Sequence, residues 1–236
     1  IPLNLRPDHS ERLNANGESS PSFSLLSFAS DVSAPTANRH FRWTATGLAQ
    51  GDTAADGIMA ATYDTLVEIR TRVRLSSMNP IRGSGNTELY HVFVHPYVLE
   101  SLKKDPEWRA NVRGAMPRSN NNPLFQGTDS YMMDGLMIHD FRYVPTTLRA
   151  ALGSKWGSAG NTDGSTILVC GAQALGYADI DVPTWVEEDK DYKNKYGIAT
   201  GKICGFLKPK FADIYSNTIE DFGAMRIDVA LPANAR

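Results

Sequence analysis

The strongest local signal in this sequence is the stretch Leu89-Tyr90-His91-Val92-Phe93-Val94, which runs directly into His95-Pro96. These six strand formers make one uninterrupted apolar run, a pattern typical of a buried strand. Proline suits the first position of a helix, because its fixed φ fits there and its missing N–H would have no partner. The stretch therefore predicts a buried strand over 89–94 that leads into a short helix over about 96–103.

Helices are predicted on both sides of this strand. Asp105-Pro106-Glu107 combines an N-cap acid with a proline and predicts a second short helix through about Ala115. Upstream, a helix is expected over about 54–76, with Thr53 and Asp56 as a capping box and an end before Pro80. Its apolar stripe at helical spacing consists of Ile58, Thr62, Leu66, Ile69 and Val73.

Downstream, turn signals separate several short strands. Asp134-Gly135 between two apolar runs predicts a hairpin over about 131–138, because this pair tolerates the positive φ angles of a tight turn. Further strands are expected at 167–170, 198–211 and 224–231, with a short helical turn over 171–177. Loops are expected at 81–87, 117–123 and 153–165, the last one mobile. Strands and helices mix without a βαβ repeat, so the predicted class is α+β.

Length and composition exclude several broad classes. The chain has 236 residues, with 24 Lys plus Arg against 26 Asp plus Glu and a formal net charge of -2. No global positive field is available to grip a polyanion, so a dedicated DNA-binding domain is not expected. No apolar run approaches the roughly 18 residues that a membrane span needs. Cys170 and Cys204 each lie in an apolar stretch, and both are predicted to be reduced core residues made in a cytosol.

The first part of the chain has a different character. Residues 1–51 are rich in Ser, Asn, Pro and Ala and predict an extended, irregular N-terminal arm or loop. Such a segment cannot bury enough surface to offset its ordering entropy, so it is expected to lie on something else, such as another subunit. Because the sequence starts at Ile1 without a signal region, we expect it to be a piece of something longer.

A search for catalytic and metal-binding motifs finds none of the strong ones. The sequence has no phosphate-binding loop that ends in Lys-Ser or Lys-Thr, and no Gly-x-Ser-x-Gly elbow. Gly83-Ser84-Gly85 leads into a strand instead of a helix, so it places no helix N-terminus at a phosphate. We therefore predict no catalytic, cofactor-binding or metal-binding residues and no cofactor.

Weaker constellations also favour structural roles. His91 and His95 would share one face of a strand, yet no carboxylate or Cys accompanies them, and His95 already serves as a cap. Two groups of acids, Asp179 with Asp181 and the cluster within 187–191, could hold Ca²⁺, but the twelve-residue loop of an EF-hand is absent. Lys190, Lys193 and Lys195 interleave with the second group, which predicts a solvated charged loop instead of a Ca²⁺ site. Arg70, Arg72 and Arg74 are expected to form ion pairs within or between subunits.

Several stretches together resemble one family. They are HVFVHPYV at 91–98 with Leu102, Asp105 and Trp108, NPLFQG at 122–127, MDGLMI at 133–138, GAQALG at 171–176 and DYKNKYG at 191–197. In order and spacing they resemble the major capsid proteins of tailed phages, particularly the N-four-like podoviral type with the Hong Kong 97-type fold. The resemblance covers about residues 54–231, roughly three quarters of the chain.

The resemblance implies a domain layout and a role. Residues 52–100 and 198–236 would form a peripheral domain and residues 101–197 an axial domain, after the arm of residues 1–51. Family members carry an extended loop and a long spine helix earlier in the chain, and residues 1–51 have no clear room for both. The implied function is to tile an icosahedral shell around double-stranded DNA.

The implied partners follow from that role. They are copies of the chain itself in hexamers and pentamers, decoration, scaffolding and portal proteins, and packaged DNA contacted without sequence specificity, with no membrane. The implied location is the virion, after assembly in the host bacterial cytoplasm.

Other classes stay open at this point. A cage-forming compartment shell would share these properties. A hydrolase whose site is dispersed in sequence would need a pocket that gathers His91, His95 or His139 with a carboxylate. A monomeric binding module, such as a tail or adhesin domain, is the third alternative.

Two further expectations concern placement. Residues 153–165 and 187–195 are expected to face neighbouring subunits or solvent instead of a ligand. A set of side chains is predicted to be mostly buried: Val92, Val94, Trp108, Leu168, Cys170, Ile203 and Phe206.

Overall fold

A computed structural model of the chain describes residues 35–51, 56–83, 87–115, 130–148, 150, 152–153, 155–180, 182–190, 192–212 and 218–232. Its centre is an eight-stranded mixed sheet with the strand order β2-β1-β14-β7-β4-β6-β5, in which β3 also pairs with β4. The strands are β1 (His40–Thr44), β2 (Gly47–Gln50), β3 (Ile81–Arg82), β4 (Glu88–Val94), β5 (Ser130–Met133), β6 (Leu136–Asp140), β7 (Gly164–Cys170) and β14 (Ala224–Ala230).

The predicted strand at 89–94 is confirmed as β4, in the interior of this sheet. It pairs with β6 in parallel and with β7 in antiparallel orientation. The two helices that follow, α2 (Pro96–Lys104) and α3 (Pro106–Ala115), are confirmed as well. His95 caps α2, because its Nδ1 accepts the backbone N–H of Tyr97 at 3.3 Å. Local signals thus placed three consecutive elements correctly.

Helix α1 (Tyr63–Leu75) is shorter than the predicted helix over 54–76. Ile58 and Ala60 instead form isolated bridges to Thr44 and Ala230, so this segment is extended along the sheet. The helix starts after Thr62, whose backbone N–H donates to Thr65 Oγ1 at 2.9 Å. The predicted cap at Thr53 lies outside the described residues.

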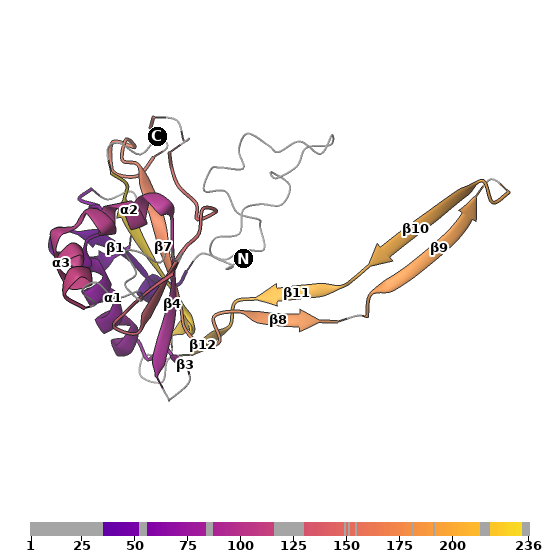
Figure 1. Ribbon diagram of the computed structural model, residues 1–236, viewed down its shortest axis with the longest axis horizontal. Coiled ribbons are helices and arrows are strands. Elements are labelled where there is room, and N and C mark those ends of the chain that lie inside the picture. Colours follow the sequence, from indigo (N-terminus) through magenta and orange to yellow (C-terminus); the bar gives the residue numbers. More distant parts are fainter. Residues whose placement is uncertain are drawn as a thin grey trace.

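The main core lies between these three helices and one face of the sheet (Figure 1). The apolar stripe of α1 packs there, with Leu66, Ile69 and Val73 fully buried. The sheet contributes alternate residues of its central strands, as expected for one covered face. The fully buried ones include Val92, Val94, Ile138, Ile167, Val169, Met225, Ile227 and Val229.

The predicted hairpin at 131–138 is confirmed as β5 and β6. Asp134 and Gly135 form its turn with φ angles of 44° and 74°, the combination that Asp-Gly adopts at low cost. A Cβ at Gly135 would lie 2.8 Å from the carbonyl oxygen of Glu88, so the close approach of the turn to β4 also requires glycine.

The prediction that residues 1–51 form an irregular arm is wrong for residues 40–50. They form β1 and β2, and β1 pairs in parallel with β14 through the register Phe41↔Ile227. Phe41, Trp43 and Leu48 are buried in the main core. Pairing with a strand almost 190 residues away supplies the stability that this polar stretch lacks locally. Residues 1–34 lie outside the described part of the chain.

The loop predicted over 153–165 ends earlier than expected, because Gly164 and Ser165 already belong to β7. The described residues before them form a turn. Trp156 and Thr162 form an isolated bridge, and Trp156 is buried. Lys155 Nζ lies 2.6 Å from Asp163 Oδ1 across the same turn. The strand predicted at 167–170 follows and is confirmed as β7.

A long two-stranded projection leaves the sheet after β7 and returns before β14 (Figure 1). From here on we call residues 176–207 the arm; this segment is distinct from the N-terminal arm predicted over residues 1–51. Its part near the sheet pairs β8 (Gly176–Asp179) with β11 (Cys204–Leu207), and its far part pairs β9 (Thr184–Lys190) with β10 (Lys195–Gly201). A small pair of β12 (Lys210–Ala212) and β13 (Ile219–Asp221) connects the arm to β14.

The arm overturns three sequence predictions. Residues 187–190 are strand instead of charged loop, because they pair with 195–198. The segment 171–177 is a turn that enters β8, not a helical turn. Ile203 and Phe206 are 59% and 51% exposed instead of buried, since a two-stranded ribbon has no interior.

Of the other five residues predicted to be buried, four are buried and one, Cys170, is only partly buried. Val92, Val94, Trp108 and Leu168 are buried. Cys170 is a free cysteine of intermediate exposure, and burial of its thiol raises its pKa to about 12. Among the described residues no helix is long and apolar enough to cross a membrane.

The division into peripheral and axial domains stays a prediction, because both terms refer to positions in a shell. Strands from both predicted ranges share the main sheet: β4 comes from the range 52–100, while β6 and β7 come from 101–197.

Candidate assembly surface

The far part of the arm exposes apolar side chains on a narrow ribbon. The register places Ile198 opposite Glu187 and Thr200 opposite Trp185. Because directly paired residues point to the same side, Trp185, Tyr196 and Ile198 share one face. They are 61%, 73% and 61% exposed. Large apolar side chains clustered this openly mark surfaces that contact another molecule.

Acids accompany this apolar face. Glu187 accepts a hydrogen bond from Trp185 Nε1 at 2.6 Å, and Asp189 lies opposite Tyr196. Glu188 points to the other face together with Val186, which is 57% exposed. The turn at the tip presents Tyr192, 98% exposed, and the cation Lys193. The arm therefore offers apolar, acidic and basic groups within one short hairpin.

The part of the arm near the sheet repeats the pattern. Tyr177 and Phe206 lie opposite each other with ring centroids 5.2 Å apart, and both are more than half exposed. Asp179 and Lys202 form an ion pair, in which Lys202 Nζ lies 2.9 Å from Asp179 Oδ2. Ile180, Val182 and Leu207 add 70% to 78% exposed aliphatic side chains. Exposed apolar surface thus extends along the whole arm.

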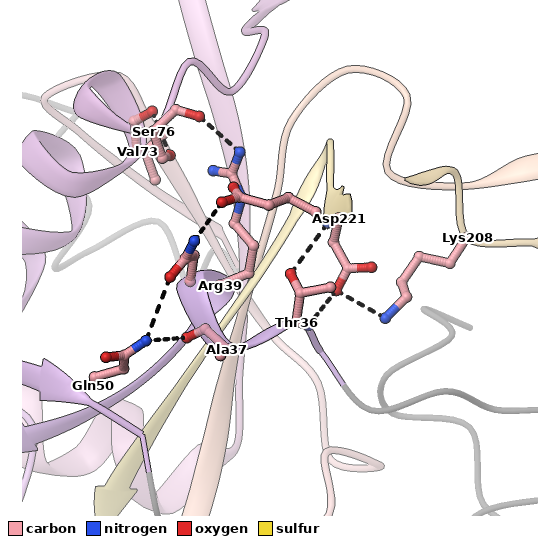
Figure 2. A network of polar contacts seen from close by, with 10 residues as sticks. Thr36, Ala37, Arg39, Gln50, Val73, Ser76, Lys208 and Asp221 are labelled. Atoms are coloured by element: carbon pink, nitrogen blue, oxygen red, sulfur yellow. Dashed lines mark hydrogen bonds and ion pairs between the residues drawn. The ribbon is translucent and has the colours of Figure 1, made fainter. Parts of the chain in front are cut away.

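A buried polar network joins the base of the arm to the rest of the molecule (Figure 2). Lys208, the first residue after β11, is 2.9 Å from Asp221 Oδ2, and Asp221 is fully buried. The same carboxylate oxygen accepts the backbone N–H of Thr36 at 2.9 Å. The backbone N–H of Asp221 in turn donates to Thr36 Oγ1 at 3.2 Å. One carboxylate therefore connects the arm with the segment that leads into β1.

Arg39 extends this network to α1. It belongs to a short 3-10 helix, η4 (Ala37–Arg39), and its Nη2 donates to the carbonyl oxygen of Ser76 at 2.7 Å. Its Nε lies 3.4 Å from Glu220, the residue before Asp221. Burial lowers the pKa of Lys208, while the hydrogen bond to Asp221 opposes that change. Through Arg39, Glu220 and Asp221, the network therefore links the end of α1 to the base of the arm.

The histidines do not form the pair considered from the sequence. His95 caps α2, whereas His91 Nδ1 lies 2.7 Å from His139 Nε2 on the neighbouring strand β6. Their rings stack with centroids 5.0 Å apart. In the described part of the chain, no three or more His, Cys, Asp and Glu side chains gather in a way that could hold a metal ion.

The other weak candidates have structural partners. Arg74 Nη2 pairs with Glu88 at 2.7 Å, and Arg70 lies 3.9 Å from the same carboxylate. Arg72 lies over the ring of Phe41, 5.5 Å from its centroid. Ion pairing within the subunit is therefore confirmed for Arg70 and Arg74. Ser84, Gly85, Asp181 and Asp191 lie outside the described residues.

The lowered pKa values of His139 and His95 predict that the stability of the protein depends on pH. Burial, and then the charge of His91, lower the pKa of His139, and burial lowers the pKa of His95. Below about pH 6.5 the unfolded chain takes up protons at His139 and His95, whereas in the folded chain both rings stay neutral until a lower pH. Stability is therefore present above this pH and is lost as the pH falls toward the lowered pKa values. Thermal unfolding between about pH 7.5 and 5 should show this loss.

The variant His139→Gln is the matched control for this pH dependence. It removes one titrating ring and should make the fall in melting temperature with decreasing pH less steep. An unchanged slope would show that the pair does not contribute.

The sequence profile of phage capsid proteins matches residues 11–233. The chain belongs to the phage capsid protein family. Within this family, it is 45% identical over 224 residues to the major capsid protein of Pseudomonas phage KPP25, which corresponds to 93% of this chain and 59% of that protein.

Solved structures show that the fold is that of phage capsid proteins. The capsid of Ralstonia phage GP4 matches with a TM-score of 0.66 at 20% identity, over 100% of this chain and 63% of that chain. The capsid of cyanophage Pam1 matches with a TM-score of 0.64 at 17% identity, over 84% of this chain and 55% of that one. The α+β class and the phage capsid fold are thereby confirmed.

This phage capsid protein chain spans about three fifths of the length of the curated relative that it matches. The family was predicted from motifs spread over residues 91–197, which include the strand β4, the turn between β5 and β6 and the tip of the arm. The apolar face of the arm was not predicted, although the alternation of Tyr196, Ile198 and Thr200 with small residues has the period of a strand.

Proposed function

We propose that this chain is a subunit of the icosahedral shell that encloses the double-stranded DNA of a tailed phage. The observation that carries the proposal is the arm, a ribbon with exposed apolar side chains over its whole length in a protein of the phage capsid family. In a shell, neighbouring copies cover such a surface, so each subunit gains stability from its neighbours. A monomer in solution would leave it open to water.

The proposed partners are first of all copies of the chain itself, arranged as hexamers and pentamers. Rings of identical subunits need two different complementary patches, and the arm and the sheet-and-helix part of the molecule offer surfaces of different character. Decoration, scaffolding and portal proteins are further proposed partners. DNA would be contacted without sequence specificity, in keeping with a net charge of -2 that gives no strong grip on a polyanion.

The proposed location is the virion, after assembly in the cytoplasm of the host bacterium. The proposed role is structural, without catalysis. The comparisons give no support to a compartment shell or a hydrolase, because the relatives they identify are phage capsid proteins.

Light scattering on the purified full-length protein tests the proposal. As salt and protein concentration are raised, we expect the scattering to increase steeply as particles form. A protein that stays monomeric under every one of these conditions would contradict a shell function.

Charge reversal on the arm gives a second prediction. In Glu187→Lys/Glu188→Lys, two exposed acids of β9 become cations, and we expect assembly to slow or to give aberrant particles. The free energy of unfolding of the monomer should change by no more than about 1 kcal/mol, because exposed charges contribute little to stability. Time-resolved scattering and urea unfolding measure the two quantities.

The variant Glu187→Gln/Glu188→Gln serves as the control for this reversal. It removes the charges without inverting them and should affect assembly less. Raising the ionic strength should reduce the difference between the two variants, because salt screens exposed charges. A normal assembly yield of the reversed variant at all salt concentrations would count against the arm as an interface.

A further inference from the structure

We propose that the arms of two copies of this chain join edge to edge, β10 against β10 in antiparallel orientation, about a two-fold axis that passes midway between the two copies of Ile198. The inference rests on the proposed shell function and names the segment and the register of one contact between subunits. It would turn two separate two-stranded ribbons into one four-stranded sheet with the strand order β9-β10-β10-β9.

The first step of the argument is that the far part of the arm is incomplete alone. β9 and β10 pair over seven residue pairs, and no other strand of the described chain belongs to their sheet. Trp185, Val186, Tyr196 and Ile198 are all between 57% and 73% exposed. A two-stranded hairpin is marginally stable in water and needs a further strand or a packed face. The outer edges of β9 and β10 are the places where a strand can add.

Charge distinguishes these two edges. β9 carries three consecutive acids, Glu187, Glu188 and Asp189. If β9 paired with a second β9 about its centre, Glu187 would lie opposite its own counterpart, and like charges directly opposite are destabilising. In β10 no charged residue occurs between Tyr196 and Gly201. Charged side chains are a common means of blocking a strand edge, so β10 is the edge left open for pairing.

The sequence of β10 also fits the two-fold register. With Ile198 opposite Ile198 of the second copy, Gly197 lies opposite Ala199, Tyr196 opposite Thr200, and Lys195 opposite Gly201. An aromatic side chain against a β-branched one is a favourable cross-strand pair, and the register places no two like charges opposite each other. The β10 register thus avoids the repulsion that the β9 edge would suffer.

The joined sheet would gather the apolar groups of both arms. Trp185, Tyr196 and Ile198 share one face of each ribbon, and antiparallel pairing on Ile198 places the two sets on the same side. Six large side chains would then form one continuous surface across the axis. Their mutual contacts would remove from water part of the area that each ribbon exposes alone.

Disulfide trapping tests this pairing. In a Cys204→Ser background, the variant Ile198→Cys places two thiols opposite each other at a Cα separation of about 4.5–5.5 Å, within the range that a disulfide bridges. We expect rapid formation of a covalent dimer on mild oxidation. The native Cys170 should stay unreactive, because burial raises the pKa of its thiol to about 12.

The matched control is Val186→Cys in the same background, because Val186 is 57% exposed and Ile198 61%. Its counterpart would lie three strand spacings across and two residues along, more than about 14 Å away and too far for a disulfide. A second test of the register mixes Lys195→Cys with Gly201→Cys proteins. Covalent dimers should form in the mixture and not in either protein alone.

Measuring cross-linking and particle formation on the same samples separates the two proposals. Particles without a dimer of the Ile198→Cys protein would overturn the β10 contact and leave the shell function standing. A dimer without particles would support the contact and contradict the shell function. A faster dimer of the Val186→Cys protein would overturn the contact in favour of the β9 edge, and the absence of both dimer and particles would contradict both proposals.

Discussion

The variant Asp228→Ala should lower the free energy of unfolding by about 3–5 kcal/mol, because it leaves the largely buried guanidinium of Arg226 without its counter-charge. Asp228 lies on β14 and is fully buried. Its Oδ1 accepts hydrogen bonds from Arg226 Nε at 2.8 Å and Thr166 Oγ1 at 3.0 Å, and its Oδ2 lies 2.5 Å from His40 Nε2. The carboxylate thus joins β1, β7 and β14 on the face of the sheet opposite the main core.

Urea unfolding of the monomer measures this loss directly. Two control variants show whether the loss of stability comes from the buried charge of Asp228. Asp228→Asn keeps the shape and part of the hydrogen bonding and should cost less than the alanine variant. Glu88→Ala removes an exposed partner of Arg74 and should cost much less than the Asp228→Ala variant, because water screens exposed charges. A loss below about 1 kcal/mol for Asp228→Ala would show that the buried cluster does not stabilise the sheet.

The variant Trp108→Ala is expected to cost a similar amount, about 3–5 kcal/mol, through the cavity that it creates. Trp108 is 5% exposed and belongs to the main core. Its ring meets Tyr131 of β5 edge to face, with centroids 6.1 Å apart and an interplanar angle of 69°. The side chain therefore connects α3 to β5, the strand at one edge of the main sheet.

Met132→Ala is the matched control for this cavity. Met132 is the neighbour of Tyr131 on the opposite face of β5 and is 63% exposed. Its truncation should change the free energy of unfolding by about 0.5 kcal/mol or less. If the two variants lost equal stability, the packing of α3 on β5 would not matter for the fold.

Elements with strong local signals were predictable from the sequence. The apolar run of β4, the prolines that begin α2 and α3, and the Asp-Gly turn between β5 and β6 each determine their structure within a few residues. In these cases the intrinsic propensity of the residues, the periodicity of apolar side chains and the turn residues all favour the same local structure. The tertiary contacts favour that structure as well, so a prediction from local sequence is correct.

Elements that depend on distant partners were not predictable. β1 is a short polar-apolar strand that exists because it pairs with β14, and the extended segment before α1 exists because Ala60 bridges to Ala230. No local pattern reveals such partners. The start of α1 was placed too early for the same reason, since Ile58 fits a helical stripe as well as it fits a strand.

The candidate assembly surface was predictable only in part. The charged stretch at 187–195 was identified as a surface segment, but its acids and lysines favoured a loop over a strand. Ile203 and Phe206 were assigned to the core because strand formers in an apolar setting are buried in most sheets. In a ribbon that leaves the sheet, the same residues stay exposed until another molecule covers them.

Cryo-electron microscopy of particles formed by the full-length protein tests the central claim most directly. The proposed function predicts a closed or tubular lattice of identical subunits in which each arm, residues 176–207, contacts a neighbouring copy. A protein that forms no lattice at any salt or protein concentration, or a lattice in which the arms extend freely into solvent, would contradict it.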